Sequence, residues 1–211
     1  MTLSPLFAYR SSPMIRHSRI EFFLSPAVYI WAAVLLLLLP VNFLLSIISA
    51  AAIHECCHLA ALRMCRVSVY RIEIHAGGAR IIAGQAAPFQ DAVCALAGPI
   101  GSFLCLLPIR QFPLFALCGF LQGLYNLLPI YPLDGGRVLR CIVRFLLPAY
   151  GDILCTAVGW CTMIALIFFN FSLALRAKDP LFLFLGAYFL LQTALPRKTP
   201  CKEGQNWVQY S

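Results

Sequence analysis

Charged side chains are scarce in this sequence: Asp, Glu, Lys and Arg make up 11% of its 211 residues. Soluble globular domains carry about 25%. Hydrophobic residues account for 61% of the chain, and its mean hydropathy is +0.83. This composition excludes an ordinary soluble domain and predicts an integral membrane protein. The first long apolar run begins after Arg19 and Glu21 and leads into further apolar segments, which is not the layout of a secretory signal peptide.

The sequence has no Cys-x-x-Cys pair, although it contains ten cysteines. The missing spacing argues against zinc ribbons and dithiol redox motifs, which depend on it. Half of the cysteines fall inside apolar runs, where a free cysteine behaves as a small hydrophobic residue. These are Cys94, Cys105, Cys118, Cys155 and Cys161. We therefore expect them to serve packing rather than a disulfide or metal framework.

Long runs of apolar residues dominate the sequence. A transmembrane helix needs about 20 largely apolar residues. Pro40 separates the first two candidates, and Asp179-Pro180 suits the start of the last, with an acidic cap before a first-turn proline. The predicted fold is a single-domain, all-α polytopic membrane protein with about six transmembrane helices. The six predicted spans are residues 22–39, 41–62, 89–108, 112–130, 150–171 and 179–196.

Two segments differ from the spans. Residues 67–84 alternate polar and apolar side chains around Gly77-Gly78, which predicts a short β-hairpin at the membrane surface. Residues 137–148 carry three arginines at helical spacing and predict an amphipathic helix in the membrane interface. We expect those arginines, at positions 137, 140 and 144, to anchor the helix at the membrane surface.

The distribution of positive charge predicts the orientation. If the N-terminus is cytoplasmic and six spans alternate, 13 of the 16 Lys and Arg residues lie in cytoplasmic segments. Only Arg110, Arg176 and Lys178 lie outside. The positive-inside rule favours this topology. The net charge of +8 is thus explained by topology, and no nucleic-acid partner is predicted.

One predicted span contains the motif His54-Glu55-Cys56-Cys57-His58. Histidines four residues apart share one helix face, so their rings can bind one Zn²⁺. Glu55 is then placed to act as general base towards water at the metal. Ionisable residues at membrane depth are costly and indicate function. Cys56 and Cys57 lie beside or away from the shared face, so they are more readily packing residues than ligands.

Asp134 is the predicted third ligand, because a catalytic zinc takes three protein ligands and keeps one position open. The other histidines, His17 and His75, lie in the N-terminal tail and the hairpin. Pro129 and Pro132 interrupt the helix before Asp134, and Gly135-Gly136 lets the backbone turn closely around its carboxylate. Taken alone, a simple helix-stopping turn would also explain Asp-Gly-Gly. His54 precedes Arg63 by nine residues, about 14 Å along a helix, which predicts a shallow site facing the cytoplasm.

"HECCH" followed by "NLLPIYPLDGG" resembles the site-2-protease class of intramembrane zinc metalloproteases. Their pattern is H-E-x-x-H with a downstream N-x-x-P-x-x-P-L-D-G. The Gly77-Gly78 hairpin and "ALAGPIGSF" at 95–103 are also similar to segments of the family, and the compact six-span layout resembles the stage IV sporulation protein FB branch. The resemblance covers roughly residues 25–195. Its paired motifs are more specific than H-E-x-x-H alone.

The resemblance implies one zinc per chain on His54, His58 and Asp134, with Glu55 activating water. It also implies that Asn126, Pro129, Pro132 and the Gly77-Gly78 hairpin hold an unwound substrate segment, to which free backbone groups can pair. For Asn126 a hydrogen bond between helices is a competing role. The chain ends fifteen residues after Pro196, so we expect neither the C-terminal nucleotide-binding domain of some branch members nor a PDZ-like insertion.

The predicted function is peptide-bond hydrolysis in a membrane-associated protein near the cytoplasmic face. The branch implies a sporulation sigma-factor precursor as substrate, membrane-protein inhibitors or regulators as partners, and the bacterial cell or forespore membrane as location. The alternative is a catalytically silent homologue that binds membrane clients, and retention of Glu55 and every ligand argues against it. A metal transporter would be expected to carry further ionisable residues along its spans, and the sequence shows none deeper than Glu55 and Asp134.

Overall fold

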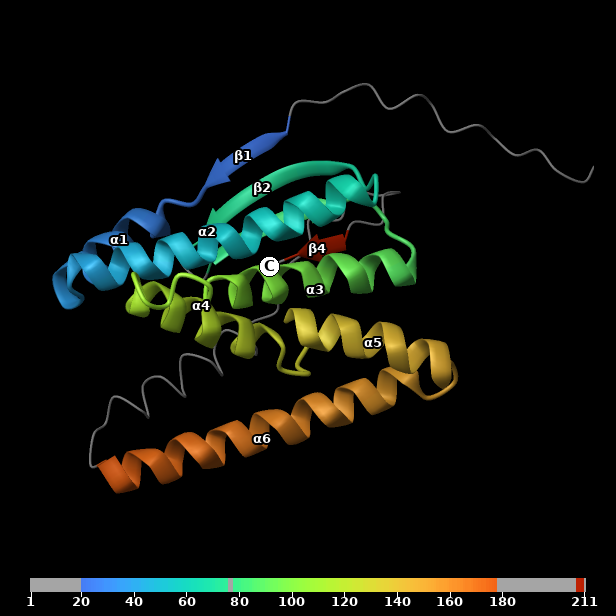
Figure 1. Ribbon diagram of the computed structural model, residues 1–211. Helices are drawn as coiled ribbons and strands as arrows, with labels where there is room; N and C mark the ends of the chain where they lie inside the picture. Colours follow the sequence, from blue (N-terminus) through green and yellow to red (C-terminus); the bar gives the residue numbers. More distant parts are fainter. Residues whose placement is uncertain (1–19, 76–77, 178–207, 211) are drawn as a thin grey trace, which may run out of the picture.

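The computed structural model describes residues 20–75, 78–177 and 208–210, and the described chain is mostly helical. Six helices and four short strands make up this part (Figure 1). In chain order they are β1 (Glu21–Leu24), α1 (Ala27–Leu38), α2 (Val41–Met64), β2 (Val69–His75), β3 (Gly78–Ala83), α3 (Pro88–Leu104), α4 (Pro113–Asn126), α5 (Asp134–Leu146), α6 (Gly151–Ala177) and β4 (Val208–Tyr210).

The strands form one sheet in the order β1-β2-β3-β4. The predicted hairpin is confirmed as β2 and β3, which pair antiparallel, with Gly78 at φ +125° opening β3. Gly77 lies outside the described residues. The all-α prediction was incomplete, because β1 pairs with β2 in parallel and β4 pairs with β3. The hairpin is therefore the centre of a larger sheet.

The helices stack on one another from α2 to α6 (Figure 1). Helices α2, α3 and α4 contact one another, α5 packs against α3, and α6 packs against α5. A buried cluster joins Ala61 and Leu62 of α2 to Ile81 and Ala83 of β3 and to Cys94 of α3. The sheet is thereby held against the pair of helices that surrounds the candidate site.

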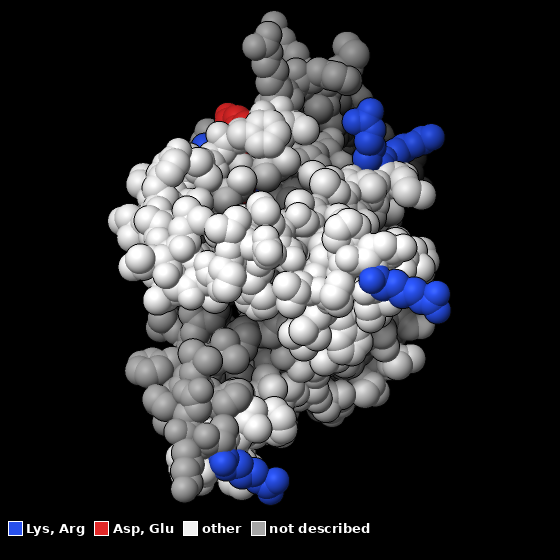
Figure 2. Space-filling model, turned by 60° about the vertical axis from the view of Figure 1, so that its left-hand side comes forward, with Lys and Arg blue, Asp and Glu red and all other residues white. Residues whose placement is uncertain are grey.

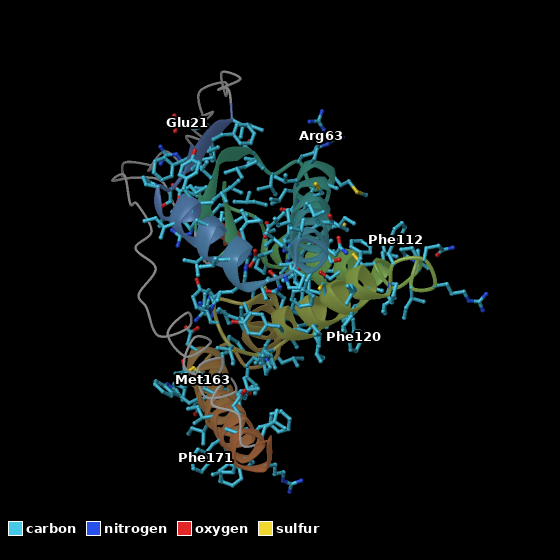
Figure 3. The ribbon with its side chains drawn as sticks, turned by 90° about the vertical axis from the view of Figure 1, so that its left-hand side faces the viewer. Glu21, Arg63, Phe112, Phe120, Met163 and Phe171 are labelled. Atoms are coloured by element: carbon cyan, nitrogen blue, oxygen red, sulfur yellow. The ribbon has the colours of Figure 1, made fainter. Side chains whose placement is uncertain are left out.

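Two described helices, α2 and α6, are long and apolar enough to cross a membrane. They contain the second and fifth predicted spans. Large apolar side chains are exposed along α1, α2, α4 and α6, and Figure 2 shows a broad face of uncharged residues with charged ones at its margins. In Figure 3, Arg63 and Glu21 lie at one end of the molecule, while Met163 and Phe171 lie on α6 towards the other. Apolar side chains exposed on this scale are expected of a surface that faces lipid.

Six full-length spans are not shown. The first predicted span begins as β1, whose pairing with β2 leaves only 12 residues for α1. Helix α3 has 17 residues before the turns at 105–112, and α4 has 14 before the proline-containing loop. Helices of 12 to 17 residues rise only about 18–26 Å, less than the roughly 30 Å hydrocarbon core of a bilayer. The sixth predicted span, 179–196, lies outside the described residues.

The amphipathic helix is confirmed as α5, but it begins three residues earlier than predicted, at Asp134. Its arginines are not simple membrane anchors. Arg137 is buried and donates to Asp91 of α3, and Arg144 makes a two-oxygen ion pair with Asp152 of α6. The arginines of α5 therefore also contact neighbouring helices, and their predicted role at the membrane surface stays a prediction.

Candidate metal centre

His54 and His58 lie on consecutive turns of α2 and are both almost fully buried. Their rings meet edge to face, with centroids 4.7 Å apart. The two Nε2 atoms are 3.1 Å apart. The four-residue spacing thus brings two imidazole nitrogens to one point, as the sequence predicts.

Asp134 approaches the same point from another helix. It is the first residue of α5, and its carboxylate is fully buried. Its Oδ2 lies 3.3 Å from Nε2 of His54 and 3.2 Å from Nε2 of His58. The fourth predicted span, 112–130, extends beyond the observed helix, because α4 ends at Asn126 and a seven-residue loop separates it from Asp134. An acidic side chain in the first turn is stabilised by the positive end of the helix dipole.

The three atoms have the spacing that a zinc site needs. Ligand atoms about 2.0–2.1 Å from a tetrahedral ion lie about 3.3 Å from one another. The observed separations, 3.1, 3.2 and 3.3 Å, match this value closely. In the described part of the chain, neither oxygen of Asp134 accepts a conventional hydrogen bond. A cation would satisfy these buried carboxylate oxygens, so the residues present fit a metal ion, and they form the one such group in the described ranges.

The outer nitrogen of each histidine is held by α3. Nδ1 of His58 lies 2.7 Å from the carbonyl oxygen of Cys94, and Nδ1 of His54 lies 2.8 Å from Oγ of Ser102. A carbonyl oxygen only accepts, so Nδ1 of His58 carries the proton and its Nε2 presents a lone pair. Such outer contacts orient metal-binding histidines and raise their basicity. Helix α3 therefore fixes the orientation of both candidate ligand rings.

Gly98 makes this close approach of α3 possible. A Cβ at position 98 would lie 2.2 Å from Nε2 of His58 and 2.7 Å from Cε1 of His54. Any side chain there would therefore occupy the space of the two rings. Gly135 has a comparable role beside Asp134, since its Cβ would lie 2.1 Å from the carbonyl oxygen of Leu127. Both glycines are required by packing.

The charge of Asp134 matches a cation site. Burial raises the pKa of its carboxyl group, but the adjacent imidazole groups of His54 and His58 outweigh burial, so the net pKa is lowered. The group is therefore ionised at neutral pH. Glu55 lies within electrostatic range of His58 and Asp134, and its Oε2 is buried without a hydrogen-bond partner among the described residues. The site thus holds three potential ligand atoms and one further carboxylate.

The other predicted site residues lie around this group in different ways. Asn126 is largely buried and donates from Nδ2 to the carbonyl oxygen of Gln122, a bond within α4. The competing role considered for Asn126, a hydrogen bond between helices, is not among its described contacts. Pro129 and Pro132 are half-buried in the loop that leads to Asp134. Gly78 is exposed at the tip of the hairpin.

The cysteines and the remaining histidines stay outside the described ligand group. Cys56 is exposed. Cys57 is half-buried and packs so closely against Gly101 of α3 that a Cβ at position 101 would lie 2.3 Å from its sulfur atom. Neither belongs to the cluster of potential metal ligands found in the described ranges. His75 interacts with Glu73, with Nε2 and Oε2 3.0 Å apart, and His17 lies outside the described residues.

Ser102, Gly98 and the Cys94 carbonyl group are functional contacts that motif analysis missed. The segment "ALAGPIGSF" at 95–103 is similar to a segment of the site-2-protease class, but that similarity assigns no contact to its residues. The available signal was spacing: residues 94, 98 and 102 recur at helical intervals within a run of small side chains. That pattern predicts a helix face on which another helix can pack closely, but it does not predict which helix packs there.

Comparison with solved structures bears on the fold. The structure matches the site-2 protease from Methanocaldococcus jannaschii with a TM-score of 0.60, covering 86% of this chain and 94% of that one. Its fold is similar to that of a site-2 protease. Sequence identity is 18%, so this likeness concerns the fold alone. Neither a protein-family model nor a curated protein sequence matches the chain.

Proposed function

We propose that this protein is an intramembrane zinc metalloendopeptidase that cleaves a membrane-associated protein. The proposal rests on one observation: the buried side chains of His54, His58 and Asp134 converge, with Nε2, Nε2 and Oδ2 lying 3.1–3.3 Å from one another. The site-2-protease-like fold supports the same conclusion. The ligand set would hold one zinc ion per chain.

The number and kind of ligands favour catalytic zinc. Two imidazoles and one carboxylate are ligand types that zinc accepts, and three protein ligands leave a fourth position open. A structural site would close that position with a fourth side chain. A metal-transport pathway would need successive sites, and the described residues contain one such ligand group. Hydrolysis explains the open position best.

When bound, zinc would polarise the scissile carbonyl group and make water more acidic. The chain's own residues complete the reaction. Glu55 follows His54 directly, and its buried Oε2 has no hydrogen-bond partner within the described ranges, so it can accept a proton from water and deliver it to the leaving amine. The Cys94 carbonyl and Ser102 keep the histidine rings oriented during this transfer. The carboxylate of Asp134 would supply negative charge that stabilises a bound cation.

A substrate within the bilayer fits the position of the site. Helix α2, which carries His54 and His58, is one of the two described helices able to cross a membrane, and the uncharged face in Figure 2 suits lipid. The proline-containing loop with Asn126, Pro129 and Pro132, together with the Gly77-Gly78 hairpin, is proposed to hold an extended substrate segment. We propose a multi-pass protein with its N-terminus and site towards the cytoplasm, as the positive charges favour.

The test is Glu55→Gln in the full chain, purified, reconstituted into liposomes and loaded with zinc. The assay follows cleavage of membrane-inserted reporter peptides, and zinc per chain is measured in parallel. We expect unchanged zinc content and cleavage lowered by about 10²–10⁴-fold, the usual contribution of a general base. Cys56→Ser is the matched control, because this exposed neighbour belongs to no ligand group. Equal cleavage by the intact and Glu55→Gln forms would remove the general-base role, and no cleavage by either would favour a silent client-binding protein.

Identity of the client is a separate question. The sequence resemblance suggests a sporulation sigma-factor precursor, with membrane proteins restraining the enzyme. Co-expression of candidate membrane-associated substrates with the intact protein and with Glu55→Gln would identify it. A product formed only with the intact protein names the client, and absence of a product from the sigma-factor precursor would remove the sporulation assignment.

A further inference from the structure

One face of α3 contacts all the elements of the metal centre. Asp91, Cys94, Gly98 and Ser102 recur at intervals of three, four and four residues, which places them in one stripe along the helix. Cys94 and Ser102 hold the two histidine rings, and Gly98 lies against both. Asp91, the remaining member, contacts neither ring, and its partner lies on α5.

That partner is Arg137. Its Nη2 donates to Oδ1 of Asp91, and the guanidinium group is only 4% exposed. Arg137 follows Asp134 by three residues, so the two side chains project from neighbouring positions on the first turn of α5. The Asp91 side chain is 21% exposed, so the pair is partly buried, and loss of Asp91 would remove the negative charge that faces the buried guanidinium group. The pair therefore ties the turn that bears the third ligand to the helix that holds the other two.

Asp134 depends on such an anchor more than the histidines do. Each histidine has an outer hydrogen bond that orients its ring. In the described ranges no comparable donor reaches the Asp134 carboxylate, whose Oδ2 faces the two imidazole nitrogens. Its position is consequently set by the backbone of α5. Among the described residues, two further ion pairs join α5 to the exposed Asp152 of α6, through Arg140 and Arg144, six and ten residues after Asp134.

We propose that the Asp91–Arg137 pair positions Asp134 for metal binding. This inference rests on the proposed zinc site. The pair acts through the helix backbone, so both are positioning residues and neither is a ligand. Breaking the pair should leave the two histidines in place and loosen the third ligand, which lowers zinc affinity and changes the coordination geometry.

The experiment measures metal binding by the purified full chain in detergent, independently of cleavage. Zinc affinity is obtained by competition with a chelator, and the visible absorption of the Co²⁺-loaded protein reports geometry, since tetrahedral Co²⁺ absorbs more strongly than octahedral Co²⁺. Asp91→Asn is expected to weaken zinc binding by about 10–100-fold and to lower the Co²⁺ absorption. Asp91→Glu, which keeps the charge, should restore most of the affinity. Asp152→Asn removes both of the more distant pairs on the same helix and should change zinc affinity by less than about twofold.

The outcomes separate this inference from the proposed function. Failure of the unaltered protein to bind zinc would refute the metal centre itself. If the unaltered protein binds zinc and Asp91→Asn shows the same affinity and the same Co²⁺ spectrum, only the positioning role is overturned. An equal loss in Asp152→Asn would also overturn it, because any anchor of α5 would then suffice. If Asp91→Asn does not fold, Arg137→Lys takes its place: reduced Co²⁺ absorption supports the proposal, and an unchanged spectrum or loss of the fold overturns it.

Discussion

Replacing Gly98 by alanine is expected to disable the metal centre although Gly98 is not a ligand. The new Cβ would lie 2.2 Å from Nε2 of His58, 2.5 Å from Cε1 of the same ring and 2.7 Å from Cε1 of His54. These atoms belong to rings already held on α3 through Cys94 and Ser102. The rings cannot rotate away without losing those bonds, so α3 and α2 must separate.

The required movement follows from the distances. Ordinary contact begins near 3.4 Å, so the His58 ring and residue 98 must part by roughly 1.2 Å. Metal sites tolerate deviations of only about 0.2 Å in ligand distance. We therefore expect Gly98→Ala to weaken zinc binding by about 100-fold or more and to lower stability by about 1–3 kcal/mol through overpacking.

The assay is zinc content after dialysis against a chelator, together with a thermal melt of the metal-free protein in detergent. Gly159→Ala is the matched control, because it also adds one methyl group to a helix and its nearest contact would be an ordinary 3.7 Å from the carbonyl oxygen of Pro129. We expect the control to keep zinc as the unaltered protein does. Zinc retained by Gly98→Ala at unaltered affinity would refute the close packing of α3 on the two rings.

Three further expectations concern the same centre. Ser102→Ala should raise the zinc dissociation constant about tenfold, because Nδ1 of His54 loses its partner, and chelator competition showing no change would contradict this role. Gly135→Ala should lower the melting temperature by several degrees, since its Cβ would meet the Leu127 carbonyl oxygen at 2.1 Å, and an unaltered melt would disprove that contact. Zinc affinity should fall at least tenfold between about pH 7.5 and pH 5.5, because metal-binding imidazoles must be neutral and protonate in this window. The lowered pKa of Asp134 keeps its carboxylate ionised there, so a flat profile would contradict histidine ligation.

The candidate ligands could be inferred from the sequence. Histidines at i and i+4 meet on any helix, and a costly carboxylate after a helix break is a strong candidate for their partner. The distances among His54, His58 and Asp134 agree with this inference. The hairpin was predictable for a similar reason, since alternation and a glycine turn are local signals.

Contacts between distant segments were not predictable. The Asp91–Arg137 pair joins residues 46 positions apart, and no local pattern distinguishes a buried arginine from a surface one. Hydropathy also overestimated several spans, because it does not show that residues 21–24 pair with β2 or that α3 ends before the turns at 105–112. The periodicity of a helical sequence shows which face carries small or apolar side chains. Which element packs against that face is decided by tertiary structure.

The most direct test of the metal centre is X-ray absorption at the zinc edge of the purified protein. We expect one zinc per chain with a shell of nitrogen and oxygen atoms at about 2.0–2.1 Å, including two imidazoles. The same measurement on Asp134→Ala should show loss of one protein oxygen or loss of the zinc. A sulfur neighbour near 2.3 Å would contradict the account, because it would place Cys56 or Cys57 in the shell instead of the carboxylate.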